Sequence, residues 1–186
     1  IQDRDLEVLR KTVQVKLNLE LAMNPLMVDI ACRVAPDQVT LVPENREEVT
    51  TEGGLDVVRH KEELTATIGK LQDAGISVSL FIDPEPEQIE TAASLSVPAV
   101  ELHTGAYANA GNHSQQELQV LARAATFVHQ AGLVLNAGHG LTYRNVTPVA
   151  ELEGMEELNI GHSIVARAVF VGMAEAVREM KDLIGR

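Results

Sequence analysis

Six short runs rich in valine, isoleucine and leucine alternate with longer segments of helical periodicity along the chain. The runs are Val15–Glu20, Gln38–Glu44, Ile76–Asp83, Ala99–Gly105, Leu133–Gly138 and Glu157–Gly161. The clearest helical segments are Asp56–Asp73, Glu85–Ser94, Ser114–Gln130 and Ser163–Ile184. Strands that alternate with helices predict βαβ units and a parallel sheet. No linker or composition break interrupts the pattern, so we expect residues 1–186 to form a single domain.

One face of the predicted strands is persistently polar. Glu101 and His103 share a face opposite Val100 and Leu102, because successive side chains of a strand point to opposite sides. A doubly wound open sheet, covered by helices on both faces, should be apolar on both. A barrel instead packs only its outer face against helices and keeps its chemistry at the inner mouth. The sequence therefore predicts an α/β fold of the (β/α)₈ TIM-barrel class with its first two strands absent from this chain, because six units fall two short of eight.

The net charge and the hydropathy of the chain indicate which partners it can bind and in which cellular compartment it is expected. The formal net charge is −12, which argues against nucleic-acid binding because phosphate backbones are held mainly by clustered lysine and arginine. No apolar stretch approaches the ~18 residues of a membrane span. The lone cysteine, Cys32, cannot form an intrachain disulfide. We expect a cytoplasmic enzyme that binds neither nucleic acid nor membranes.

Histidines and glutamates gather at the ends of the predicted strands. His103, His139 and His162 each follow an apolar run, where a barrel keeps its active site. Glu20, Glu44 and Glu101 are predicted to point inward, and a buried glutamate with a raised pKa is a good proton shuttle. The alternative for these carboxylates is a structural ion pair inside the barrel, with Lys16 as one candidate partner. Asn18, on the face of Glu20, is an accessory candidate together with His103 and Glu44.

Two similar glycine motifs follow the last two predicted strands. They are Asn136–Leu141 and Asn159–Ile164, and the second leads directly into a helical segment. Small residues let backbone N–H groups approach an anion, and the loops after the last two strands of a barrel commonly bind phosphate. These motifs predict a phosphate site.

Several segments, in order along the whole chain, closely resemble the pyridoxine 5′-phosphate synthase family of bacterial vitamin B6 synthesis. They are Val15–Glu20, Leu41–Asp56, Val78–Asp83, Glu101–Gly105, Asn136–Tyr143 and Glu157–His162. The long block up to Asp56 is the most specific of these segments. The resemblance implies a TIM barrel that condenses 3-amino-2-oxopropyl phosphate with 1-deoxy-D-xylulose 5-phosphate and releases phosphate and water. It implies neither a redox cofactor nor a required metal.

The resemblance also implies roles for individual residues. Glu20 resembles the family's proton-transferring glutamate, His139 its proton donor and Glu101 the glutamate that stabilises charge in the transition state. The positions that match its substrate- and phosphate-binding residues are Thr50, Gly140, Gly161 and His162. The family implies a symmetric homo-octamer, and the apolar Val165, Val169, Phe170 and Met173 fit either an interface or the core.

Two other functions remain open from the residues alone. The first is a metal-dependent barrel aldolase or isomerase, because mixed carboxylate and imidazole ligands suit Mn, Fe or Zn. Its ligands would be Glu20, Glu101, His103 and His139. The second is an inactive barrel fragment that only binds phosphorylated metabolites, but the retention of Glu20, Glu101 and His139 argues against it.

The family's first two strands, with an Asn-x-Asp-His signature and a His-x-Arg element, have no counterpart in the chain. Loss of two strands would expose sheet edges. We therefore expect residues 1–186 expressed alone to be unstable and inactive. Circular dichroism and a turnover assay on this polypeptide check the expectation, and normal turnover would contradict it.

Overall fold

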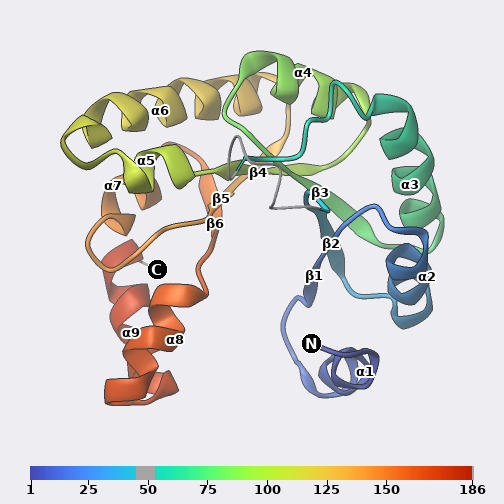
Figure 1. The fold of residues 1–186 in the computed structure, drawn as a ribbon, viewed down its shortest axis with the longest axis horizontal. Coiled ribbons are helices and arrows are strands. Elements are labelled where there is room, and N and C mark those ends of the chain that lie inside the picture. The colour runs from blue at the N-terminus through green and yellow to red at the C-terminus, as the bar shows by residue number, and fades with distance from the viewer. Residues whose placement is uncertain (45–52, 186) are drawn as a thin grey trace.

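The computed structural model describes residues 1–44 and 53–185, in which six parallel strands alternate with helices (Figure 1). The strands are β1 (Asn18–Leu21), β2 (Gln38–Leu41), β3 (Ser77–Ile82), β4 (Ala99–His103), β5 (Val134–Gly138) and β6 (Met155–Asn159). The α-helices are α1 (Asp3–Thr12), α2 (Pro25–Val34), α3 (Lys61–Asp73), α4 (Pro86–Ser94), α5 (Gly105–Asn109), α6 (Ser114–Gln130), α7 (Val146–Ala150), α8 (His162–Val171) and α9 (Met173–Ile184), and η1 (Gly111–His113) is a 3₁₀ turn.

The strands lie in the sheet in the order in which they occur in the chain. Each pairs in parallel with the next, from β1 to β6. A doubly wound sheet would reverse its strand order at a switch point, and this sheet does not. The sheet curls, and the helices form an arc around its outside, with α1 at one end and α8 and α9 at the other (Figure 1). The predicted barrel-type α/β fold is confirmed as a half-barrel.

The two faces of the sheet differ as the alternation predicts. The outer face carries Val39, Leu80 and Leu102, which are completely buried against the helices. On the inner face Glu101 stands opposite Phe81 on β3 and Asn136 on β5. Because parallel pairing keeps like faces together, the polar residues of neighbouring strands become neighbours inside the curl.

Helix α2 was not among the helical segments expected from the periodicity. Its first residues nevertheless explain why a helix begins there. The Asn24 side chain accepts a hydrogen bond from the Leu26 N–H at 3.0 Å and caps the helix, and Pro25 occupies its first turn. Both residues stabilise the start of a helix. The asparagine side chain satisfies a backbone N–H group that has no partner inside the helix, and a proline in the first turn removes no helical hydrogen bond. The helix ends at Val34, and the residue that caps it, Ala35, has a left-handed φ of 51°.

One predicted helix and two predicted strands have different limits in the structure. The segment Asp56–Asp73 becomes helical only at Lys61, because the chain before it turns and the Val57 N–H donates to Gln88 Oε1 at 2.8 Å. The strands also shift by a few residues. β1 begins at Asn18 rather than at residue 15, and β6 spans residues 155–159 rather than 157–161.

The prediction of one continuous helix over Ser163–Ile184 was wrong. Gly172, with φ 84° and ψ 154°, divides it into α8 and α9. An L residue with a side chain rarely adopts this backbone conformation, so glycine permits the break. The two helices then pack against each other.

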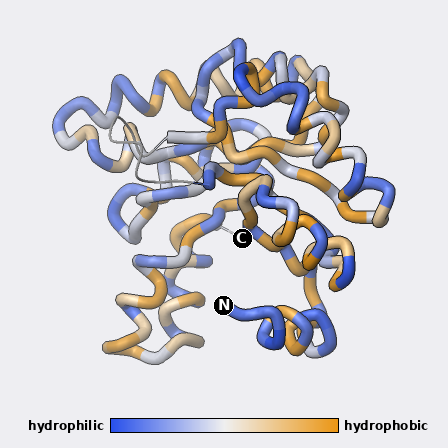
Figure 2. Tube along the Cα trace, turned by 45° about the vertical axis from the view of Figure 1, so that its right-hand side comes forward, coloured by the Kyte–Doolittle hydropathy of each residue, from blue (hydrophilic) through white to orange (hydrophobic). Residues whose placement is uncertain are grey.

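Apolar side chains of this helical pair lie at the surface rather than in the core. Val169 is 79% exposed and Phe170 84%, and Figure 2 shows hydrophobic residues along α8 and α9. The core alternative for these residues is therefore wrong within the described chain. None of the helices in the described residues is long and apolar enough to cross a membrane.

A matched pair of glycines tests how the chain packs on the end of β3. A Cβ at Gly54 would overlap the backbone of Ile82 and Asp83, whereas one at Gly69, inside α3, would meet no atom within 4 Å. We expect Gly54→Ala to lower the free energy of unfolding by about 1–3 kcal/mol through overpacking. Gly69→Ala should raise it by about 0.5–1 kcal/mol, because alanine favours helix.

Urea unfolding of both variants measures this difference. Equal stabilities of the two variants would contradict the close approach at Gly54.

Candidate active site

A pocket of about 1420 Å³ lies at the carboxyl ends of the strands. It is lined by most of the residues that the sequence nominated: Glu20, Glu44, Glu101, His103, His139, Gly140, Gly161 and His162. Thr50 lies outside the described residues. Asn18 does not line the pocket; its Oδ1 accepts a hydrogen bond from the Thr40 hydroxyl at 3.1 Å. The strand order thus brings residues from the whole chain to one face.

Glu101 is a buried carboxyl in the middle of this pocket, with only 3% of its surface exposed. Burial raises the pKa of Glu101 to about 7, and the negative charges of Glu20 and Glu157 act in the same direction. Asn159 opposes the rise, because its Nδ2 donates to Glu101 Oε2 at 2.6 Å. Glu101 can therefore exchange a proton near neutral pH.

Space for the Glu101 carboxyl depends on a neighbouring glycine. Gly138 is its near neighbour on β5, and a Cβ there would overlap Glu101 Oε1 and approach the Asn159 carbonyl oxygen to 3.0 Å. The close approach, rather than an unusual φ, explains why residue 138 has no side chain.

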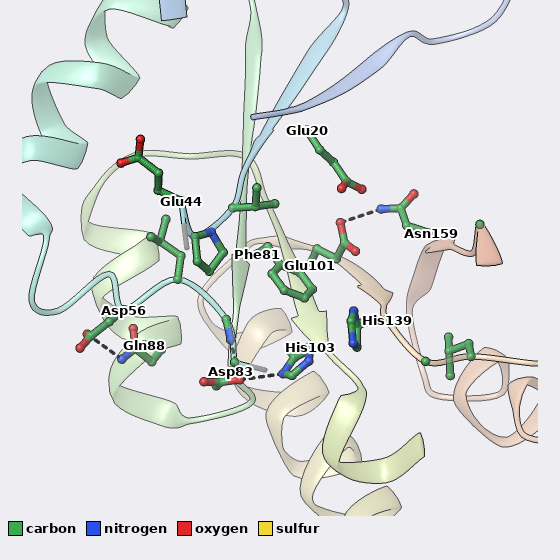
Figure 3. A pocket seen from close by; sticks show the side chains of 18 of the residues that line it. Glu20, Glu44, Asp56, Phe81, Asp83, Gln88, Glu101, His103, His139 and Asn159 are labelled. Carbon is green, nitrogen blue, oxygen red and sulfur yellow. Dashed lines mark hydrogen bonds and ion pairs between the residues drawn. The ribbon is translucent and has the colours of Figure 1, made fainter. Parts of the chain in front are cut away.

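Glu20 extends from β1 toward Glu101, and the two carboxyl groups face each other across the pocket (Figure 3). Glu20 is exposed, unlike Glu101. Lys16 was the candidate partner for a structural ion pair with these glutamates, but it pairs with Glu157 on β6. The structure thus leaves Glu20 open to a ligand in the pocket.

His103 and His139 lie side by side below Glu101 (Figure 3). Their ring centroids are 5.0 Å apart with the planes tilted by 58°, and the Phe81 ring meets His103 edge-on at 5.2 Å. His103 Nδ1 lies 3.0 Å from Asp83 Oδ1. The hydrogen-bond partner that the structure shows for His103, an accessory candidate from the sequence, is therefore Asp83.

The backbone at His139 is in the left-handed region, with φ 82°. Such a conformation is uncommon for a residue with a side chain and persists only where the surroundings hold it. The completely buried Thr104 does so: its hydroxyl lies 2.7 Å from the carbonyl oxygen of Gly138 and 2.5 Å from that of His139. Its one proton is shared between the two acceptors. Thr104 therefore fixes the direction in which the imidazole leaves the end of β5.

The residues predicted to bind phosphate line the pocket where the chain leaves β5 and β6. Gly161 is the N-cap of α8, His162 is its first residue, and both are exposed. A Cβ at Gly161 would meet no atom within 4 Å, so the space over this helix start is open. Gly140, with φ 74°, lies in the loop after β5. A helix N-terminus flanked by exposed glycine suits an anion.

Glu44 lies away from these groups. Its Oε1 accepts a hydrogen bond from Asn24 Nδ2 at 3.3 Å, and Figure 3 shows its carboxyl group pointing away from Glu101. The structure therefore places Glu44 at the edge of the pocket, apart from the Glu20 and Glu101 pair.

Sequence reasoning missed three residues that hold the others in place: Asp83, Thr104 and Asn159. Asp83 ends a predicted strand on the same alternating face as Phe81, so its position was readable. The partners of Thr104 and Asn159 are 34 and 58 residues away in the chain. No spacing rule predicts such contacts, because they depend on the register of three strands.

The metal-dependent alternative gains no support from this geometry. Within residues 1–44 and 53–185, no three histidine, cysteine, aspartate or glutamate side chains come together as a metal-binding group.

Comparison with known proteins identifies relatives over the full chain. The family model described as "Pyridoxal phosphate biosynthesis protein PdxJ" matches residues 1–186. A protein of Synechococcus sp. named pyridoxine 5′-phosphate synthase is 60% identical over 185 residues, which cover 99% of this chain and 75% of that protein. Its counterpart in Thermosynechococcus vestitus is 58% identical and covers 99% and 78%.

Among solved structures, the tryptophan synthase A-subunit of Pyrococcus furiosus is similar in fold, with a TM-score of 0.67. The match covers 99% of this chain and 72% of that chain at 16% sequence identity. At this identity the likeness supports the barrel-type fold alone.

The electrostatic environment of Glu101 predicts opposite pKa shifts in two variants. Glu20→Gln removes a neighbouring negative charge and should lower the pKa of Glu101 below about 7. Asn159→Ala removes the donor to Oε2 and should raise it further. The ¹³C chemical shift of the Glu101 carboxyl carbon, followed against pH, measures both.

Glu90→Gln, on the exposed side of α4, is the control and should leave the titration unchanged. A Glu101 midpoint that does not move in either test variant would refute the assigned causes.

Proposed function

Because the chain belongs to the PdxJ family of pyridoxal phosphate biosynthesis proteins, we propose that it catalyses the pyridoxine 5′-phosphate synthase reaction with Glu20, Glu101 and His139 as acid–base groups. The substrates are 3-amino-2-oxopropyl phosphate and 1-deoxy-D-xylulose 5-phosphate. Their condensation forms pyridoxine 5′-phosphate and releases phosphate and water.

The observation that carries the assignment of the acid–base groups is the buried Glu101 carboxyl with a pKa of about 7. Near this pH a carboxyl group is present in both protonation states, so it can accept a proton in one step and return it in another. An ordinary exposed glutamate is almost entirely ionised at neutral pH. Burial of Glu101 thus supplies the property that the reaction requires.

Ring closure requires proton transfers at several neighbouring atoms of the joined substrates. One group cannot reach them all, so carboxyl and imidazole groups on different sides of the pocket suit the chemistry. Glu20 faces Glu101 from β1, and His139 lies below Glu101 at the end of β5 (Figure 3). In this proposal Glu20 transfers protons, His139 donates one, and Glu101 stabilises charge in the transition state by taking up or releasing a proton.

Gly140, Gly161 and His162 are proposed to hold a substrate phosphate. The exposed start of α8 offers backbone N–H groups that are not used inside the helix, and the helix dipole favours an anion there. The protein has a net charge of −12, which repels anions. Binding of two substrates that each carry a phosphate group therefore depends on such local groups. Thr50 remains a proposed substrate-binding residue on the basis of the motif match.

Two features of the proposal extend beyond the pocket. A symmetric homo-octamer and a cytoplasmic location stay predictions from the sequence and the family. The exposed Val169 and Phe170 of α8 support the idea of an interface, because large exposed apolar patches on a protein surface mark interaction sites.

A turnover assay tests the function directly. The protein expressed from its own gene, supplied with the two phosphorylated substrates, should form pyridoxine 5′-phosphate. His139→Asn should lower kcat by roughly 10²- to 10⁴-fold, the usual contribution of a general acid. His113→Asn, on the exposed turn η1, is the matched control and should leave kcat within about twofold.

Absence of product from the unmodified protein would overturn the proposed function. Normal turnover of His139→Asn would overturn only the role of His139.

A further inference from the structure

We propose that Asp83 is a positioning residue for the reaction, whose carboxylate holds His103 in the Nδ1-protonated tautomer against His139. The proposal rests on the proposed function in one respect, the role of His139 as the proton donor. Asp83 follows β3, and its hydrogen-bond partners in the structure are His103 and the Gly54 N–H.

The protonation state of Asp83 determines which nitrogen of His103 carries the proton. Burial tends to raise the pKa of Asp83, but the hydrogen bonds from His103 and from the Gly54 N–H outweigh it, and the pKa is lowered. An ionised carboxylate can only accept hydrogen bonds. His103 Nδ1, 3.0 Å from Asp83 Oδ1, must therefore be the donor, and in the neutral ring Nε2 carries no proton.

Asp83 itself is held by a second donor. The Gly54 N–H donates to the same Oδ1 at 2.9 Å, and next to it the Leu55 N–H donates to the Phe81 carbonyl oxygen at 2.7 Å. Donors from two separate parts of the chain thus meet on one oxygen atom. A carboxylate fixed in this way has little freedom to rotate away from His103.

The imidazole of His103 is confined on two sides by other rings. It is buried between the Phe81 ring, 5.2 Å away, and the His139 ring, 5.0 Å away. Gly105 leaves the space that the two rings occupy, because a Cβ there would lie 2.6 Å from His103 Nε2 and 3.3 Å from His139 Cδ2. The orientation of the His103 ring therefore sets the surface that His139 contacts.

These contacts form a chain from β3 to the proposed proton donor. Asp83 sets the tautomer and direction of His103, and His103 forms one wall against which His139 packs. Hence Asp83 acts through His103 rather than on substrate.

The test uses the protein expressed from its own gene, with ¹⁵N-labelled histidine, and His103→Gln to assign the ring signals of His103. In the unmodified protein the ¹⁵N shifts should show the Nδ1–H tautomer. Asp83→Ala should give a mixture of tautomers and lower kcat by roughly 10- to 100-fold, the factor that one lost hydrogen bond to a charged group is worth. KM should change by less than about threefold, because the effect lies in the chemical step.

Asp83→Asn separates this role from a general loss of structure. The amide oxygen can accept both hydrogen bonds, so this variant should recover the Nδ1–H tautomer and most of kcat. Asp29→Asn, which removes a surface carboxylate paired with Lys70 between α2 and α3, is the control and should change neither measurement.

Three results would overturn the proposal: an Nε2–H tautomer in the unmodified protein, unchanged kcat in Asp83→Ala, or an Asp83→Asn variant that loses tautomer and kcat as Asp83→Ala does. The tautomer is read without substrate, so it tests Asp83 even if the protein fails to form pyridoxine 5′-phosphate.

Discussion

Parallel pairing of consecutive strands is the constraint on which the pocket depends. Side chains alternate along each strand, and parallel neighbours keep the same side chains on the same face. Phe81, Glu101 and Asn136 are paired across β3, β4 and β5 and face inward. The residue two positions after each of them must then face inward as well. The strand ends therefore present Asp83, His103 and Gly138 together, although they are distant in the chain.

Burial of the polar side chains on the inner face is unfavourable in free energy, and this penalty explains the acid–base properties of the face. Polar groups taken out of water lose hydrogen bonds that the protein must replace. Glu101 recovers one from Asn159, yet burial still raises its pKa to about 7. Deeper in the curl, the buried atoms Gln38 Nε2, Ser79 Oγ and Asn136 Oδ1 have no hydrogen-bond partner among the described residues. The outer face, lined with Leu80 and Leu102, supplies the apolar burial that offsets this cost.

Rigidity at the ends of β4 and β5 comes from short contacts around residues without side chains. Gly138 leaves room for the Glu101 carboxyl, and Gly105 lets the two imidazoles approach. Thr104 holds the left-handed backbone at His139. An acid–base group is useful only when its proton is directed at one atom, so this close packing matters as much as the identity of the titratable residues.

The sequence by itself determined the class of fold, the order of its strands and most of the residues that reach the pocket. Hydrophobic periodicity is local, and alternation along a strand assigns Glu101 and His103 to one face without knowledge of the neighbours. The sequence alone did not determine that Glu101 forms a hydrogen bond with Asn159, that His103 forms one with Asp83, or that Lys16 pairs with Glu157. These contacts, like the break of the last helix at Gly172, were decided by the tertiary structure, because they depend on strand register, curl and packing between segments that no local pattern encodes.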